Sequence, residues 1–382
     1  MNGVVMPEFA FPLMDTVNQE ASIKVIGIGG GGGNAVSHMV TKGIQGVEFI
    51  CANTDTQDLR MTKAETQLQI GINETQGLGS GSKPEIGRAS AEEDRERIAA
   101  VINGANMLFI AAGLGGGTGT GASPVVAEIA QEKGILTVAV VNTPFTWEGE
   151  KRRENAERGI NDLERFVDSL IVIPNDKLQA LGNRATVMGG FAAANDVLSN
   201  SVQGIAELIT IPGHVNLDFA DVKTVMAETG RGIIGMGTAS GQDRGREAIE
   251  AAIQSPLLED FKLEGAKGIL INVTAGADLT GDEFEEIGEI VTGYASEDAE
   301  IITGFVVDDS LQDSIRVTVV LTGLDQRLDN QSDGRKNFIE PFPELDKPIT
   351  SRNKDLFEDL PAEGDDQINF LDVPSFLKRN RG

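Results

Sequence analysis

The sequence predicts an α/β protein whose doubly wound, mostly parallel sheet is joined by a long central helix to a smaller α+β domain. Short continuous apolar runs alternate with helical periodicity between Ile23 and Ile173, which is typical of strands buried on both faces by crossover helices. Two glycine-rich turns each follow such a run and open a helix. An unbroken apolar stripe near residue 200 supplies the long helix.

The first part of the chain is expected to contain five strands. A helix that follows the first strand should begin near Asn34, which can serve as its N-cap, and end at Gly43. Another helix, through Val125 and Ile129, should follow the second glycine-rich turn. The expected strands cover residues 23–28, 47–52, 107–112, 135–141 and 170–173.

The long helix is predicted from apolar residues spaced three and four apart, and Pro212-Gly213 ends it. Its stripe consists of Val187, Phe191, Ala194, Leu198, Val202, Ile205 and Ile209. The order of elements then changes, which indicates a smaller domain with a mixed sheet. Its expected helices lie near residues 218–228, 246–253 and 282–292, and its strands near 268–273, 301–307 and 315–322.

Composition divides the chain further. Residues 1–20 are expected to form a flexible arm, 21–185 the domain with the glycine-rich turns, 186–212 the central helix and 213–325 the second domain. Residues 326–368 are polar, proline-containing and acidic, as in a disordered linker. Residues 369–382 are apolar with a basic end. A hydrophobic peptide on such a linker is typical of a segment that a partner binds, the alternative being a frayed terminus.

Charge and cysteine content exclude several classes of function. A net charge of −27 repels phosphate backbones, so nucleic-acid binding is not expected. No apolar run is long enough for direct membrane insertion. Cys51 is the only cysteine and is expected to be a buried small hydrophobe. The two histidines, His38 and His214, cannot form a zinc site by themselves.

The glycine-rich turns predict phosphate binding. Gly27 to Gly32 contains G-x-G-x-x-G, which is a weak signal, while Gly113 to Gly121 adds the hydroxyls of Thr118 and Thr120. Neither turn contains the Walker lysine motif, so backbone amides, two helix N-termini and Mg²⁺ would have to offset the phosphate charge. A third cluster, Gly77 to Ser82, is either a phosphate-sensing loop or an ordinary surface loop.

These motifs resemble the tubulin-type signature of the FtsZ family of division GTPases. The resemblance rests on Gly115 to Gly121, Gly29 to Asn34, Asn53-Thr54-Asp55 and Asn216 to Asp221, and it covers about residues 23–323. It implies a tubulin-like fold, a GTP-binding domain over 21–185 and an activating, polymerisation domain over 213–325. It also implies GTP and GDP as ligands, with Mg²⁺, and hydrolysis of GTP to GDP and phosphate.

The resemblance assigns roles to residues of the first domain and the central helix. Phe191 would pack on the purine, and Asp196 would accept hydrogen bonds from guanine, a pattern that adenine cannot match. The alternatives are a core residue for Phe191 and a helix ion pair for Glu148 with Arg152. The implied nucleotide contacts are Gly30, Gly31, Gly32, Gly33, Asn34, Ser80, Gly81, Ser82, Gly117, Thr118, Gly119, Glu148, Arg152, Asn175, Phe191 and Asp196.

Asp218 and Asp221, with Asn216, are the implied catalytic residues. Asp218 as N-cap and Asp221 in the first turn would also suit plain helix capping. In the family this segment inserts into the nucleotide site of the next subunit, where the acids activate water. Such head-to-tail association does not close and gives filaments.

The resemblance also implies partners and a location. The peptide from Asp372 to Asn380 would bind membrane-tethering and regulatory division proteins, and the chain would be cytoplasmic and concentrated at the mid-cell division site. Lys378, Arg379 and Arg381 are too few basic residues for stable anchoring on a membrane.

Two other functions fit parts of the pattern. A nicotinamide-dependent oxidoreductase would use the first glycine-rich turn, with Asp55 holding the ribose, but it leaves the second turn unexplained. A non-catalytic scaffold with a vestigial nucleotide site would keep binding and lack turnover.

Overall fold

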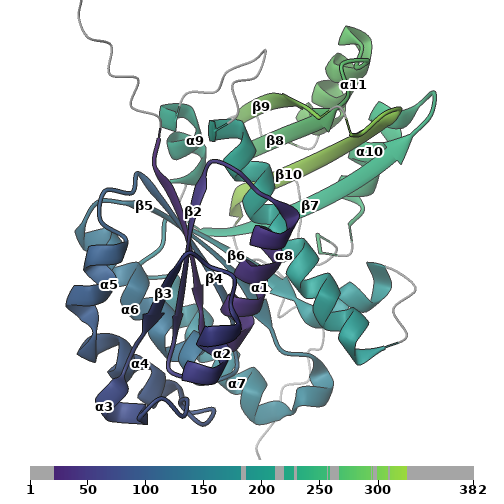
Figure 1. Ribbon diagram of the computed structural model, residues 1–382. Coiled ribbons are helices and arrows are strands. Elements are labelled where there is room, and N and C mark those ends of the chain that lie inside the picture. The colour runs from purple at the N-terminus through teal and green to yellow at the C-terminus, as the bar shows by residue number, and fades with distance from the viewer. Residues whose placement is uncertain are drawn as a thin grey trace, which may run out of the picture. The chain divides into compact units, whose positions relative to one another are not determined.

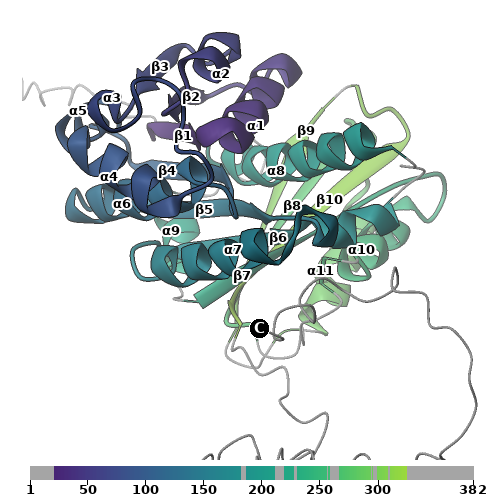
Figure 2. The ribbon, with the colours of Figure 1, turned by 90° about the horizontal axis from the view of Figure 1, so that it is seen from below.

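Among the described residues of the computed structural model, ten strands form one continuous sheet. The structure describes residues 21–181, 186–210, 219–227, 230–255, 257–258, 266–293, 295, 299–308 and 310–324. Helices lie on both sides of the sheet (Figures 1 and 2). In sheet order the strands are β3 (Thr66–Gln69), β2 (Val47–Asn53), β1 (Ile23–Ile28), β4 (Met107–Gly113), β5 (Leu136–Thr143), β6 (Ser169–Pro174), β7 (Gly230–Ser240), β10 (Ser314–Leu324), β8 (Gly268–Ala275) and β9 (Glu300–Val307).

The sheet is mostly parallel, as the sequence predicts. Every pairing from β3 to β7 is parallel, and β8 pairs with β9 in parallel. Within the part of the chain that the structure describes, β10 is the one strand of the sheet that runs antiparallel to its neighbours, β7 and β8. The five strands expected in the first part are all present, and their bounds differ from the predictions by two residues at most.

Helices connect and cover these strands. The helices of the first part are α1 (Gly29–Lys42), α2 (Thr56–Met61), α3 (Ile72–Thr75), α4 (Pro84–Glu93), α5 (Arg95–Val101), α6 (Thr118–Glu132), the 3₁₀ turn η1 (Thr146–Glu148), α7 (Glu150–Leu163) and the 3₁₀ turn η2 (Asn175–Leu181). Later helices are α8 (Val187–Thr210), α9 (Phe219–Met226), α10 (Arg244–Ile253) and α11 (Gly281–Thr292).

Three buried clusters hold the layers together. One lies between the sheet and α1, α8 and α9, and includes Val36, Met39 and Val202. A second lies on the opposite face of the parallel strands, under α5, α6 and α7. A third packs α10 and α11 against the sheet of the second half. Burial on both faces explains why the central strands are continuous apolar runs.

Helix α1 begins five residues earlier than the sequence predicts. It starts at Gly29, within the glycine-rich turn, rather than near Asn34, and it ends at Gly43 as expected. Glycine is a poor helix former, but here the absence of a side chain permits close packing. A Cβ atom on Gly32 would lie 2.3 Å from the carbonyl oxygen of Ala111 on β4. Tertiary contact therefore overrides intrinsic propensity.

Strand β7 was not predicted, and it joins the two halves of the sheet. Its residues Gly230 to Gly232 pair in parallel with Ser169 to Ile171 of β6. The expected smaller domain is therefore continuous with the first sheet. A Cβ on Gly237 would lie 2.0 Å from the carbonyl oxygen of Ala248 on α10, so glycines that weaken the strand pattern serve the close approach of a helix.

The long helix is present as α8, but its apolar stripe is not buried throughout. Ala194, Leu198 and Val202 are buried, whereas Val187 is 61% exposed and Phe191 is 38% exposed. The exposed first turns of α8 lie beside the carboxyl ends of the parallel strands. A core role therefore does not account for Phe191.

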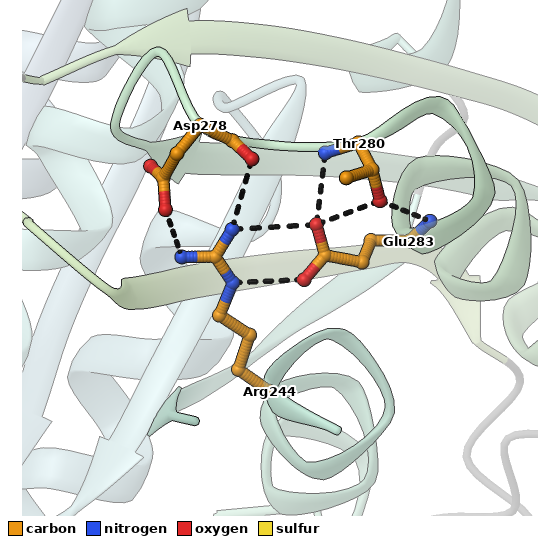
Figure 3. Close-up of polar contacts among 4 residues, drawn as sticks. All are labelled: Arg244, Asp278, Thr280 and Glu283. Carbon is orange, nitrogen blue, oxygen red and sulfur yellow. Dashed lines mark hydrogen bonds and ion pairs between the residues drawn. The ribbon is translucent and has the colours of Figure 1, made fainter. Parts of the chain in front are cut away.

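An ion-pair cluster ties the helices of the second half together (Figure 3). Arg244, whose side chain is 7% exposed, lies with its Nε atom 2.8 Å from Oε1 of Glu283 and also pairs with Asp278. Glu283 in turn forms a capping box with Thr280 at the start of α11. The cluster therefore fixes the N-termini of α10 and α11 to each other.

Several predictions fall outside the described residues. These are the arm 1–20, Pro212-Gly213, His214, Asn216, Asp218, the linker 326–368 and the peptide 369–382. Within the part of the chain that the structure describes, no helix is both long and apolar enough to cross a membrane.

Candidate functional site

A pocket of about 530 Å³ opens at the carboxyl ends of the parallel strands. Both glycine-rich turns, the Gly77 to Ser82 loop and the start of α8 contribute to its lining. This is the edge where α/β sheets bind ligands. The predicted contacts that line the pocket are Gly30, Gly31, Asn34, Ser80, Gly81, Ser82, Gly117, Thr118, Gly119, Glu148, Arg152, Asn175 and Phe191.

Gly32 and Gly33 do not line the pocket. Gly32 packs against the backbone of Gly27 and β4, and a Cβ on Gly33 would lie 3.1 Å from Cγ2 of Thr62. The two residues therefore seat α1 against its neighbours. Their contribution to the pocket is the position that they give to Gly30 and Gly31.

Two helix N-termini in the pocket offer backbone donors. Helix α1 is preceded by Ile28 and α6 by Gly117, and neither N-cap side chain accepts a hydrogen bond from its helix. The first N–H groups of a helix have no partner within it, and together with the helix dipole they favour an anion. Both N-termini belong to residues that line the same pocket.

The hydroxyls of the second turn differ in function. Thr120 Oγ1 accepts a hydrogen bond from the Gly115 backbone amide at 2.8 Å and does not line the pocket, so it stabilises the turn itself. Thr118, the first residue of α6, lines the pocket, and its Oγ1 contacts the hydroxyls of Thr54 and Ser80. Of the two hydroxyls that the sequence offers in this turn, that of Thr118 therefore lies at the pocket and that of Thr120 does not.

Little cationic charge faces the pocket. Among the described lining residues Arg152 is the only Lys or Arg, against Asp55, Asp58 and Glu148. Arg152 pairs with Glu148, which also accepts a hydrogen bond from the Phe145 amide at 2.9 Å. Glu148 therefore connects Arg152 to the start of turn η1, which a simple ion pair within one helix would not do.

Among the described residues, one aromatic side chain lines the pocket, Phe191 on α8. Phe191 packs edge-on against Phe145, with ring centroids 5.4 Å apart, and against Trp147, with centroids 6.0 Å apart. Phe145 is 3% exposed, while Phe191 is 38% exposed and lines the pocket. Two neighbours thus hold a ring whose remaining surface is free to contact a flat ligand.

Asp196 does not line the pocket, whereas its neighbour Asn195 does. The Asp196 carboxylate instead contacts Nε2 of His38 at 2.8 Å and Nζ of Lys42 at 2.9 Å, both on α1. Successive helix residues point about 100° apart, so a change of one position moves the candidate from the pocket to the α1 side. In this structure Asp196 is therefore engaged with α1, and Asn195 is the neighbour that faces the pocket.

Two buried amides at the pocket were left without a partner. The Oδ1 atoms of Asn142 and Asn175 have no hydrogen-bond partner among the described residues, and both side chains line the pocket from the ends of β5 and β6. Buried polar groups are normally satisfied. The sequence indicates Asn175 only through the resemblance, and Thr54 only as part of the Asn53-Thr54-Asp55 motif, without a role. It does not indicate Asn142 or Asn195, because no local pattern marks a strand-end or helix residue as facing a ligand.

No protein-only metal centre is present within the described ranges, where no three His, Cys, Asp or Glu side chains cluster. The lining carboxylates are compatible with Mg²⁺, which usually keeps several waters and binds one or two carboxylates together with phosphate oxygens. Asp55 Oδ1 is already used as the N-cap of α2, where it accepts hydrogen bonds from the amides of Gln57 and Asp58. The cap uses one oxygen of Asp55, and the carboxylate still lines the pocket.

Asp221 lies in the first turn of α9, is exposed and does not line the pocket of its own chain. Cys51 is buried, as predicted, and burial raises the pKa of its thiol to about 11 although a hydrogen bond with Thr62 opposes this. A thiol of this kind is not a nucleophile at neutral pH.

Comparison with known proteins is consistent with this geometry over nearly the whole chain. Residues 22–183 match the model of the Tubulin/FtsZ family GTPase domain, and residues 230–325 match the FtsZ family C-terminal domain. The cell division protein FtsZ of Coxiella burnetii is 50% identical over 381 residues, covering 97% of this chain and 99% of that protein.

The FtsZ of Pseudomonas aeruginosa is 50% identical over 390 residues, with the same coverage of 97% and 99%. Among solved structures, an empty FtsZ dimer of M. jannaschii superimposes with a TM-score of 0.78 at 44% identity, covering 81% of this chain and 90% of that chain.

Proposed function

The chain belongs to the Tubulin/FtsZ family, and from this premise we propose that it assembles head to tail and hydrolyses GTP at each contact between subunits. Membership makes the chain a tubulin-like GTPase of cell division. The proposal adds which residues bind the nucleotide, which residues activate water, and why the two sets meet only between copies.

The observation that carries the proposal is the convergence of two uncapped helix N-termini on one pocket. Helices α1 and α6 begin at Gly29 and Thr118, and neither has a side-chain cap. A polyphosphate would occupy the donors that these helices leave unused. Since Arg152 is the one cationic side chain among the described lining residues, backbone amides carry most of the recognition. Gly30, Gly31, Gly117 and Gly119 give a phosphate access to these amides.

We assign the base to the aromatic end of the pocket. Phe191 would pack on the purine, held by Phe145 and Trp147. Asn195 and Asn175 would read its polar edge, since an amide both donates and accepts and guanine presents both kinds of group. Asn195 thus replaces Asp196 in the role that the resemblance implied. Glu148 and Arg152 would contact the ribose and a phosphate.

We also assign Mg²⁺ to the phosphate end, where phosphate oxygens and a lining carboxylate would hold it. Of Asp55 and Asp58 we favour Asp58, because Asp55 already accepts hydrogen bonds as the N-cap of α2. The cation would neutralise phosphate charge that this acidic pocket leaves uncompensated. Ser80, Gly81 and Ser82 would lie near the terminal phosphate.

The catalytic acids would come from the next subunit. Asp221 is exposed and outside the pocket of its own chain, and we propose that Asp221, Asp218 and Asn216 orient the water that attacks the terminal phosphate. Each subunit then carries nucleotide at one end and acids at the other, so assembly does not close. The dimer of the M. jannaschii protein supports self-association of this fold.

Turnover measured against protein concentration tests the proposal. We expect the GTPase rate per subunit to rise steeply above a critical concentration, and light scattering with GTP to rise at the same concentration. Asp221→Ala should retain GTP binding and lose turnover. Asp162→Ala, on α7 and outside both the pocket and α9, is the matched control and should retain both.

Mixing two inactive variants tests the shared site directly. Asp221→Ala lacks a catalytic acid, and a Gly116→Trp variant, with a bulky ring at a pocket-lining position, lacks the nucleotide. A mixture should recover part of the activity, because some contacts combine an intact pocket with an intact acid. Full activity of a monomer, or no recovery on mixing, would refute the shared site. Retained GTP binding without any wild-type turnover would favour a scaffold instead.

The remaining assignments concern partners and location. We propose that the peptide from Asp372 to Asn380 binds membrane-tethering and regulatory division proteins, and that the chain acts in the cytoplasm at the mid-cell division site. Phe376 and Leu377 of this peptide, with Phe370 just before it, are apolar and suit capture by a groove on a partner.

A further inference from the structure

Three buried hydroxyls meet at the phosphate end of the pocket. Thr54 Oγ1 lies 2.6 Å from Thr118 Oγ1, and Ser80 Oγ lies 3.0 Å from the same atom. The three residues come from the end of β2, the start of α6 and the Gly77 to Ser82 loop, and all three line the pocket. They are 0%, 8% and 6% exposed for Thr54, Thr118 and Ser80.

Counting protons shows what this arrangement can do. Each hydroxyl has one proton to donate, and its oxygen can accept two hydrogen bonds. Three hydroxyls joined by two contacts use two protons, so one proton remains for another acceptor. Within the described part of the chain, Thr118 Oγ1 has no hydrogen-bond partner other than these two hydroxyls.

The remaining proton belongs on Thr118 when an anion is bound. If Thr54 and Ser80 both donate to Thr118 Oγ1, its own O–H is left to point at the ligand. A hydroxyl that accepts two hydrogen bonds is polarised and donates more strongly. Because Thr118 opens α6, its O–H also lies at the positive end of that helix.

Neighbouring residues fix the positions of Thr54 and Ser80 next to Thr118. Its backbone carbonyl accepts hydrogen bonds from the Gly79 amide at 3.3 Å and from Thr75 Oγ1 at 3.2 Å. These bonds fix the backbone of Thr54 without using its hydroxyl. Ser80 is confined as well, since a Cβ on Gly117 would lie 2.1 Å from Ser80 Oγ.

We propose that Thr54 is a positioning residue whose hydroxyl, together with that of Ser80, orients the Thr118 O–H toward a phosphate oxygen of the bound nucleotide. The inference rests on the proposed function, because it requires a phosphate next to Thr118. It gives a role to the middle residue of Asn53-Thr54-Asp55, a motif to which the nucleotide assignments above give none.

Removing the Thr54 hydroxyl alone tests the inference. Thr54→Val keeps the shape and the β-branched backbone preference of threonine and leaves the carbonyl bonds in place. Calorimetry should show GDP and GTP binding weakened about fivefold, the scale of one net hydrogen bond, while guanosine, which has no phosphate, binds as to the wild type. Thr54→Ser, which retains the hydroxyl, should restore GDP affinity.

Two comparisons separate positioning from a general structural effect. In a Thr118→Val background, Thr54→Val should have no further effect on GDP affinity, because the donor that it orients is gone. Thr137, near the amino end of β5, has an equally buried hydroxyl that donates a hydrogen bond to the Ile135 carbonyl. Thr137→Val removes this hydroxyl away from the pocket and should leave GDP affinity unchanged.

Equal loss of guanosine and GDP binding in Thr54→Val, or additive effects of the two valine substitutions, would overturn the inference while the proposed function stands. A wild-type chain that binds no guanine nucleotide would overturn both.

Discussion

The Oδ1 atom of Asp196 on α8 lies 2.8 Å from Nε2 of His38 on α1. Lys42, one turn further along α1, reaches the same oxygen at 2.9 Å. Burial of the carboxylate acts to raise its pKa, but hydrogen bonds from Lys42 and His38 together outweigh burial, and the pKa of Asp196 is lowered. An ionised carboxylate therefore fastens α8 to α1 beside the pocket.

This relationship predicts different effects for two adjacent residues. Asp196→Asn should lower the free energy of unfolding by about 0.5 kcal/mol, the scale of a partly exposed ion pair, and leave GDP affinity nearly unchanged. Asn195→Ala should weaken GDP binding about fivefold, as expected for one lost hydrogen bond, with little effect on stability. Thermal unfolding and calorimetric titration of both variants check the prediction. The reverse pattern would restore Asp196 as the base-reading residue.

Two glycines of the pocket region should respond differently to alanine. A Cβ on Gly32 would lie 2.3 Å from the Ala111 carbonyl oxygen, whereas a Cβ on Gly116 would meet no atom within 4 Å. Gly32→Ala should destabilise the fold by about 2 kcal/mol or more, because backbone must move. Gly116→Ala should unfold at nearly the wild-type temperature but bind nucleotide more weakly, since the methyl group occupies the pocket. Equal melting temperatures would contradict this account of Gly32.

How far the sequence predicts this fold depends on what each segment packs against. Strands such as β1 and β4 are buried on both faces, so their continuous apolar runs predict them. The bounds Ile23–Ile28 of β1 are predicted as observed. Strand β7 and the first turn of α1 are rich in glycine, which lowers both strand and helix propensity. Their structure depends on close approach to α10 and β4, and no local pattern reports that contact.

The candidate site shows the same limit at the level of single residues. Glycine-rich turns after apolar strands predict a phosphate site because the chemistry requires bare backbone at a helix N-terminus. The sequence does not predict which side of α8 faces the pocket. Whether Asn195 or Asp196 lies there depends on how α8 packs against α1. Asn142 ends a buried strand and carries no signal until β5 and β6 are seen side by side.

Acid should weaken the cluster around Arg244 (Figure 3). Hydrogen bonds from Arg244 and, against some opposition from burial, from Thr280 lower the pKa of Glu283 to about 2. Because the folded pKa lies below the ordinary value of about 4.3, the stabilisation is complete above that value and is lost as pH falls toward 2. Urea unfolding of wild type and Glu283→Gln should therefore differ by about 2 kcal/mol at neutral pH and converge in acid.

A matched control distinguishes this cluster from general acid unfolding. Glu285 is exposed on the same helix and has no ion pair within the described residues. Glu285→Gln should follow the wild-type unfolding curve at every pH. A constant gap between wild type and Glu283→Gln from neutral pH to pH 3 would show that the carboxylate of Glu283 is not held ionised by Arg244.

The single cysteine should report the opening of α1. Cys51 is 1% exposed on β2, and burial raises the pKa of its thiol to about 11, so only about one thiol in ten thousand is ionised at pH 7. Iodoacetamide should leave the native chain unlabelled over a time in which denatured chain reacts completely, as mass spectrometry can measure.

Since Gly33 of α1 packs over the sulfur of Cys51, labelling of this thiol requires local opening. A nucleotide bound at the N-terminus of α1 stabilises the closed state, so GDP should slow the residual labelling. Cys51→Ser gives the background, and rapid labelling of the native chain that GDP does not slow would contradict both the burial and the coupling.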